Sequence, residues 1–284
     1  MAAAQWKIGT RTIDFAQHAL IMGVLNVTPD SFSDGGQFFD AETAVEQGMS
    51  MAADGAGIID VGGESTRPGA EAVPEEEERA RVIPVIEKLR ARGCEALISV
   101  DTSKAAVARA ALAAGAKIVN DISGGRADAE MMPLVRESGA GFIIMHMQGT
   151  PRTMQKNPQY GDVVAEVGEF FRQQYARAIS CGIDAMAIAF DPGIGFGKTL
   201  AHNMELLRNL PKLRIADRPI VLGVSRKSFI AKLIGSPEMA AREAPTLAFT
   251  ALLRERGADV IRVHDVKPNV VALRATEALL NSPQ

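Results

Sequence analysis

The sequence predicts an α/β fold: a single (β/α)8 barrel over residues 1–284, with a short N-terminal β-hairpin at about residues 6–15. Two observations support this. Eight short runs rich in isoleucine and valine alternate with longer amphipathic segments, and the runs end about 34 residues apart on average. The runs are apolar throughout, which is typical of parallel strands covered by helices. A (β/α)8 barrel of ~250 residues has eight such units.

The expected strands are residues 20–26, 57–62, 96–101, 117–121, 141–147, 186–191, 219–225 and 258–264. Segments 41–53 and 76–91 lie between strands and carry apolar residues at helical spacing. Gly9 and Thr10 mark the turn of the expected hairpin. The alternative is a doubly wound open sheet, which usually has fewer strands and one switch point for its chemistry. No Pro/Gly/Ser-rich linker divides the chain, so one domain is expected.

Composition narrows the class of function. Apolar residues make up 47% and charged residues 23%, as in folded globular proteins. A net charge of -3 excludes a basic field for non-specific nucleic-acid binding. Cys94 and Cys181 are far apart, which excludes a disulfide framework and suits a reducing compartment. Because no secretory signal or membrane-length apolar run is visible, we expect a cytoplasmic protein without nucleic-acid or membrane partners.

A polar residue stands at the end of every expected strand. The set is Asn26, Asp60, Asp101, Asn120 with Asp121, His146, Asp191, Ser225 with Lys227, and Arg262 with His264. The C-terminal strand ends of a barrel surround one active-site cavity. Each residue alone could be a helix cap, and one of residues 101–103 is expected to cap the next helix. All eight together favour a shared site.

The set also indicates a ligand. Asp101, Asn120 and Asp191 suit a flat heterocycle with several N–H donors. Arg262 and His264, two residues apart on one strand, face the same side and suit phosphate or diphosphate. Residues 225–228 are expected to open a helix whose N-terminus binds an anion. One Asn or Asp together with substrate phosphates could hold Mg²⁺.

Other features favour structural roles or lids. Residues 193–199 end like a P-loop, but Pro192 replaces the required first glycine, so Thr199 is expected to be a helix cap and Lys198 structural. The acidic run 75–78 predicts a solvated helix N-terminus. Residues 28–36 and 62–69 are long polar loops bounded by glycine, as in lids that close over a substrate.

Segments 26–36 (NVTPDSFSDGG) and 60–69 (DVGGESTRPG) resemble the two signatures of the dihydropteroate synthase family. Shorter matches follow in the same order at 99–102, 120–122, 145–149, 191–193, 225–228 and 262–266. The resemblance runs from about residue 20 to 270. Residues 126–138 and 236–245 match no motif of the family.

The resemblance implies a (β/α)8 transferase of folate synthesis, usually a homodimer, that uses Mg²⁺. Such an enzyme joins p-aminobenzoate to 6-hydroxymethyl-7,8-dihydropterin diphosphate and releases diphosphate. It implies a catalytic set of Asn26, Lys227, Arg262 and His264, with Asn26 as the Mg²⁺ ligand. It assigns the pterin to Asp101, Asn120, Asp191, Phe196, Gly223 and Lys227. It implies that the diphosphate is bound by Asn26, Thr66, Arg262, Val263 and His264. It implies that p-aminobenzoate is bound by Phe32, Thr66, Arg67, Pro68 and Ser225. Asp60 matches a polar residue near the pterin and the diphosphate.

An aniline nitrogen is a poor nucleophile, so catalysis is expected to act on the leaving diphosphate, with lids that exclude water. Three alternatives remain. A pterin-dependent methyltransferase would need a corrinoid partner and has no use for the Arg262–His264 pair. A Schiff-base aldolase would need Lys227 inside a strand. A non-catalytic pterin-binding protein leaves the two lids unexplained.

Overall fold

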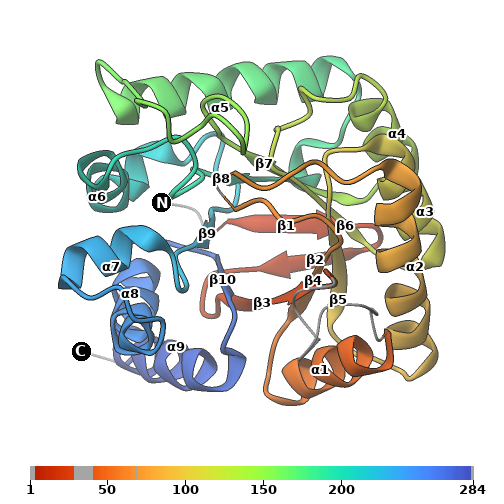
Figure 1. Cartoon of the computed structure of the whole chain (residues 1–284), viewed down its shortest axis with the longest axis horizontal. Coiled ribbons are helices and arrows are strands. Elements are labelled where there is room, and N and C mark those ends of the chain that lie inside the picture. The colour runs from red at the N-terminus through yellow and green to blue at the C-terminus, as the bar shows by residue number, and fades with distance from the viewer. Residues whose placement is uncertain (1–3, 29–40, 68, 283–284) are drawn as a thin grey trace.

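The computed structural model describes residues 4–28, 41–67 and 69–282, and in these ranges eight parallel strands form one sheet (Figure 1). The strand order is β8-β7-β6-β5-β4-β3-β10-β9. A bridge between Phe190 in β8 and Ile220 just before β9 joins the two ends of this sheet. The helices surround the strands, so the predicted fold class, a (β/α)8 barrel, is confirmed.

Every expected strand is present, and most are one or two residues shorter than expected at one or both ends. The barrel strands are β3 (Leu20–Asn26), β4 (Ile58–Gly62), β5 (Leu97–Asp101), β6 (Ile118–Asp121), β7 (Gly141–Met145), β8 (Ile188–Asp191), β9 (Val221–Gly223) and β10 (Val260–Val263). Between them lie α1 (Ala41–Ala53), α2 (Glu75–Ala91), α3 (Ala105–Ala114), α4 (Met131–Ser138), α5 (Val163–Ser180), α6 (Leu200–Arg208), α7 (Ser228–Ile234) and α8 (Glu243–Glu255), and α9 (Val266–Leu280) follows β10. The part of the chain that the structure describes also contains the short 3-10 helices η2 (Ala185–Ala187), η3 (Leu210–Leu213) and η4 (Ala240–Arg242).

The expected hairpin covers the N-terminal end of the barrel. Its strands, β1 (Gln5–Ile8) and β2 (Arg11–Asp14), pair antiparallel and lie across the middle of the ring in Figure 1. Trp6 is fully buried, and its indole N–H donates to the carbonyl of Ala187 at 2.8 Å. Trp6 packs in one cluster with the first residues of the barrel strands. The hairpin thus leaves the opposite, C-terminal end as the open mouth.

Strand alternation sorts the barrel interior into an apolar layer below a polar one. Side chains two apart on a strand share a face. The apolar layer near the hairpin contains Met22, Ile58, Ile118, Ile143, Ala189, Val221 and Val260. The residues two positions further along these strands are Val24, Asp60, Asn120, Met145, Asp191, Gly223 and Arg262. The same alternation places Asn26, the last residue of β3, on the interior face at the mouth.

Two expectations about the starts of helices need correction. None of residues 101–103 caps α3: Lys104 precedes the helix, and the N–H of Ala105 donates to Asp128 at 2.8 Å. Ser225 does not open α7, which begins at Ser228. Its hydroxyl bonds His264 instead.

Glu78 also differs from expectation. It is 1% exposed instead of solvated, because α2 turns it inward against Lys104, which also pairs with Glu64. By contrast, Thr199 caps α6 as predicted, in a capping box with His202.

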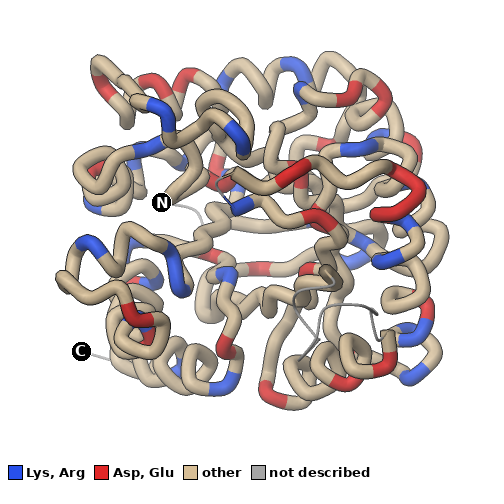
Figure 2. Tube along the Cα trace, viewed as in Figure 1, with Lys and Arg blue, Asp and Glu red and all other residues tan. Residues whose placement is uncertain are grey.

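Positively and negatively charged residues are interspersed along the outer helices (Figure 2). Within the described ranges, the helices lack the combination of length and apolar character required to cross a membrane.

Candidate active site at the barrel mouth

Arg262 lies at the centre of the polar layer. Its Nε donates to Oδ2 of Asp60 at 2.6 Å, and its Nη2 donates to Oδ2 of Asp101 at 2.7 Å. Asn120 also donates to Oδ2 of Asp60, at 3.0 Å. These bonds connect β10, β4, β5 and β6 across the barrel. Asp101, Asn120 and Arg262, three of the residues expected to bind the pterin and the diphosphate, therefore form one hydrogen-bonded group with Asp60.

Burial shapes the charges of this group. Asp60 is fully buried, and within the described ranges its Oδ1 has no hydrogen-bond partner. Burial raises the pKa of Asp101 to about 7, against the opposing attraction of Arg262 and with further repulsion from Asp60 and Glu78. Because these carboxylates are shielded from water, hydrogen bonds from the N–H donors of a ligand would stabilise their ionised forms strongly.

Asp191 and Lys227 form the other half of the layer. Oδ1 of Asp191 accepts the N–H of Gly193 at 2.7 Å. Lys227 donates to the carbonyl of Ile194, and its Nζ lies 4.7 Å from the ring centroid of Phe196. Burial lowers the pKa of Lys227 to about 8 and raises that of Asp191, and the attraction between the two charges opposes both shifts.

Gly223 leaves room between the two halves. A Cβ at this position would lie 3.6 Å from Nζ of Lys227 and 3.7 Å from Cβ of Arg262. Gly223 therefore faces the same space as both cations. The assignment of Gly223 to a pterin pocket, which the resemblance implies, stays a prediction.

Ser225 and His264 meet above β9 and β10. The hydroxyl oxygen of Ser225 lies 3.1 Å from Nδ1 of His264 and accepts its backbone N–H at 3.2 Å. Burial and the charges of Arg262 and Arg226, with a smaller effect of Arg67, lower the pKa of His264 to about 4. His264 is thus neutral near pH 7, and Arg67 lies close enough to affect it.

The remaining expected residues are less closely joined. Thr66 is half-buried and Arg67 exposed, both in the loop after β4. Val263 is fully buried in the cluster between strands and helices, so it faces away from the barrel interior. Asn26 is half-buried at the end of β3. Phe32 and Pro68 lie outside the described residues.

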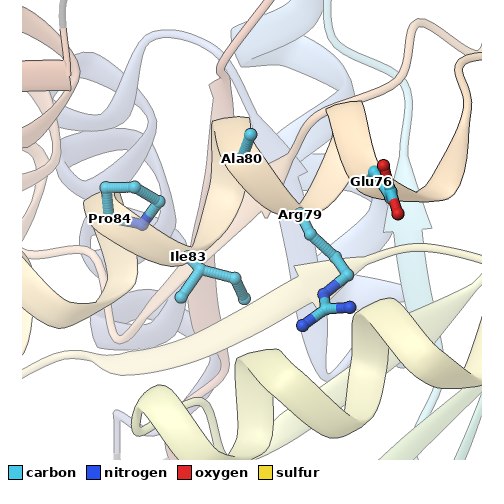
Figure 3. Close-up of a pocket in the computed structure, with 5 residues that line it drawn as sticks. All are labelled: Glu76, Arg79, Ala80, Ile83 and Pro84. Atoms are coloured by element: carbon cyan, nitrogen blue, oxygen red, sulfur yellow. The ribbon is translucent and has the colours of Figure 1, made fainter.

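A hollow elsewhere on the surface carries no comparable chemistry. It measures about 390 Å³ and is lined by Glu76, Arg79, Ala80, Ile83 and Pro84, all on one side of α2 (Figure 3). Its cation, Arg79, is exposed and lies 4.0 Å from Glu75 of the same helix. The mouth, where buried acids and bases converge, is the stronger candidate site.

Sequence reasoning missed the environment of Lys198. This residue is 3% exposed, and its ammonium lies 3.0 Å from Nδ1 of His146, itself a strand-end residue without an assigned role. Burial lowers the pKa of Lys198 to about 7 and, with the charges of Lys198 and Arg126, that of His146 to about 2. The polar strand end at His146 was a visible signal, but its partner was not.

Comparisons with known proteins point the same way. Residues 22–264 match the family described as pterin binding enzyme. A dihydropteroate synthase of Synechocystis sp. is 44% identical, over 96% of this chain and 94% of its own. A Xanthomonas albilineans dihydropteroate synthase solved with 4-aminobenzoic acid has a TM-score of 0.91 and 42% identity, over 99% of this chain and 100% of its own. A structure of that enzyme with 7,8-dihydropteroate has a TM-score of 0.88 and 40% identity, over 98% of this chain and 100% of its own.

Proposed function

This chain belongs to the dihydropteroate synthase family of pterin-binding enzymes, and from this premise we propose how its barrel mouth performs the family's reaction. The reaction is a transfer: p-aminobenzoate replaces diphosphate on the methylene carbon of 6-hydroxymethyl-7,8-dihydropterin diphosphate. The observation that carries the proposal is the convergence of Asp60, Asp101, Asp191, Lys227 and Arg262 on one buried polar layer.

The pterin ring binds between the two halves of this layer. Asp101, Asn120 and Asp191 accept or share its ring N–H groups, and Lys227 donates to a ring acceptor. Within the described ranges, Oδ1 of Asp101 and Oδ2 of Asp191 accept no hydrogen bond from the protein, which leaves both available. The ring of Phe196 supplies an apolar edge of this pterin pocket, and Gly223, which has no side chain, leaves space for the pterin ring. The raised pKa values of the two carboxyl groups support this role, because a ligand N–H would stabilise their ionised forms.

The diphosphate binds above Arg262, near His264, Thr66 and the backbone of Val263. Arg262 supplies positive charge, and neutral His264 supplies a hydrogen bond that Ser225 orients. This arrangement stabilises the negative charge that grows on the departing diphosphate, which is the largest catalytic contribution expected here.

Mg²⁺ fits beside Asn26. The described residues contain no cluster of three or more His, Cys, Asp or Glu that could hold a metal alone. A single interior amide oxygen at the mouth suits a cation that takes most of its other ligands from phosphate and water. When bound there, Mg²⁺ would neutralise charge on the diphosphate.

p-Aminobenzoate binds on the outer side of the diphosphate site, where Thr66, Arg67 and Ser225 offer a guanidinium and hydroxyls for its carboxylate. We assign Phe32 and Pro68 to the same side by their family motif. The aniline nitrogen forms a bond to the methylene carbon as the carbon–oxygen bond to diphosphate breaks. The bonding electrons leave with the diphosphate, and the nitrogen loses its proton to solvent or phosphate.

A homodimer is supported by the outer face of α7, α8 and α9, which lie together in Figure 1. Leu233, Leu252, Val271 and Leu279 on these helices are between 46% and 78% exposed. These side chains offer apolar surface for an association, and a second copy of the chain, which the family resemblance implies, is the partner proposed. A cytoplasmic location is supported by Cys94 and Cys181, which are both free thiols.

The test is product formation from purified protein. With Mg²⁺ and both substrates, we expect equal amounts of diphosphate and dihydropteroate. Omission of p-aminobenzoate should stop diphosphate release, and EDTA should suppress both products. Diphosphate release at an unchanged rate without p-aminobenzoate would contradict a condensation.

A further inference from the structure

The ammonium of Lys198 is buried among neutral acceptors. Its Nζ lies 3.0 Å from Nδ1 of His146 and donates to the carbonyls of Gly193 and Phe196 at 3.0 Å each. The carbonyl of His146 lies 3.4 Å away. Four acceptors from two different loops thus surround a group with three protons, and no carboxylate is among them. Removing such a group from water costs free energy, and these hydrogen bonds offset part of that cost.

The partners of Lys198 belong to a turn that packs backbone against backbone. Gly193 has φ of 64°, and a Cβ on it would lie 1.9 Å from the carbonyl oxygen of His146. Gly197 has φ of 62°, and its Cβ would lie 2.6 Å from the carbonyl oxygen of Gln148. The 193–197 turn therefore rests directly on the chain that follows β7, and Lys198 bonds both layers.

The same turn faces the pterin end of the proposed site. The carbonyl of Ile194 accepts from Lys227, and the Phe196 ring lies beneath its ammonium. Asp191, at the start of the turn, accepts from Gly193. Any shift of the turn would thus move the two groups that contact Lys227 and the Gly193 N–H that Asp191 accepts.

We propose that Lys198 is a positioning residue for pterin binding: its ammonium fixes the 193–197 turn on the His146 strand end and so holds Phe196 and the Ile194 carbonyl against Lys227. This inference rests on the proposed function. Lys198 touches neither substrate; it acts through the turn. The donation to Nδ1 also keeps His146 neutral with its proton on Nε2, since Nδ1 must then be an acceptor.

Lys198→Met tests the proposal, because it keeps the length of the side chain and removes the donor. We expect at least a tenfold increase in KM for the dihydropterin diphosphate. KM for p-aminobenzoate, measured at a saturating pterin substrate, should change less than twofold. Calorimetry with 6-hydroxymethylpterin should show the same loss of affinity without turnover.

A matched control is Trp6→Phe, which removes one buried hydrogen bond at the opposite end of the barrel. It should lower Tm yet leave both KM values unchanged. Equal effects of Lys198→Met on both KM values, or no effect on pterin affinity, would overturn the proposal. If Lys198→Met does not fold, Lys198→Gln carries the same comparison.

A second measurement separates charge from bulk. In Lys198→Ala, n-propylammonium should restore pterin affinity in a saturable way, whereas sodium chloride at equal ionic strength should not. Absence of restoration would count against a role for the ammonium. Wild-type protein that makes no dihydropteroate would refute the proposed function, but the pterin-binding comparison would still decide the role of Lys198.

Discussion

Arg262 and Asp101 are direct partners across the barrel, with Nη2 of the guanidinium 2.7 Å from Oδ2 of the carboxylate. The guanidinium that we propose to neutralise the diphosphate therefore also holds a carboxylate that we propose to bind the pterin. On this proposal, binding at one half of the substrate affects the other half. This coupling has consequences for stability as well as for affinity.

Arg262→Met should weaken binding of both the pterin and diphosphate, and lower the free energy of unfolding by about 3–5 kcal/mol, because Asp60 and Asp101 stay buried without their cation. Urea unfolding would measure the loss of stability, and calorimetry with 6-hydroxymethylpterin and, separately, with inorganic diphosphate would measure the two losses of affinity. Arg214→Met is the control, since it breaks a buried pair with Asp259 away from the mouth. That variant should lose comparable stability and bind pterin normally; a parallel loss of pterin binding would mean that instability alone explains both.

Asp191→Asn should reduce pterin affinity by tenfold or more. The amide oxygen can still accept the N–H of Gly193, so the turn keeps its shape, but the charge opposite Lys227 is lost. Titration with 6-hydroxymethylpterin checks this. Asp184→Asn, which removes an exposed partner of Lys7, should leave the affinity unchanged. An unaltered affinity in Asp191→Asn would remove this residue from the pocket.

Gly193→Ala should destroy the pterin end of the site. The added Cβ would lie 1.9 Å from a backbone oxygen, which no side-chain adjustment relieves. Gly139→Ala is a matched control because its φ is also 64° but the space around its Cβ is open. Gly139→Ala should cost roughly 1 kcal/mol of stability from backbone strain alone. We expect Gly193→Ala to cost several times more and to abolish pterin binding, and similar results for the two variants would argue against the tight packing of this turn.

His146 should make the protein less stable in mild acid. Burial and the charge of Lys198 lower its pKa from 6.5 to about 2 in the folded state. Between these values the unfolded chain binds a proton that the folded protein does not, so this contribution is complete above about pH 6.5 and is lost as pH falls. The slope is about 1.4 kcal/mol per pH unit for one proton.

The comparison of wild type with His146→Gln isolates this residue from the other titrating groups. Glutamine can still offer an oxygen to Lys198 but binds no proton. Urea unfolding at several values between pH 7 and 4 should show a smaller decline for the variant. Parallel curves would show that His146 does not titrate on unfolding.

Much of the fold was predictable because its signals are local. Apolar runs define strands wherever they occur, and the residue at each strand end follows from the run. Alternation then places Asp60, Asn120 and Asp191 on the interior face without further information. The resemblance added the roles, but the convergence on one mouth follows from the barrel alone.

The errors and omissions concern side chains whose partners come from elsewhere in the chain. Glu78 stands in an acidic first turn that would normally be solvated, and only Lys104 from the next unit explains its burial. The bond from Arg262 to Asp101 depends on the reach of a side chain across the barrel. Lys198 stands in a turn that looked ordinary, because no pattern in the sequence reveals that His146 lies under it.

The ring of strands has a weak join. In the described part of the chain, β8 and the segment leading into β9 share a single bridge, Phe190 to Ile220, whereas the other neighbouring strands pair over three or more residues. Asp191 ends β8 on one side of this join, and Lys227 follows β9 on the other side. A pterin bound by both residues, as we propose, would tie the two sides of the barrel together here, so we expect slower amide exchange along β9 when the pocket is occupied.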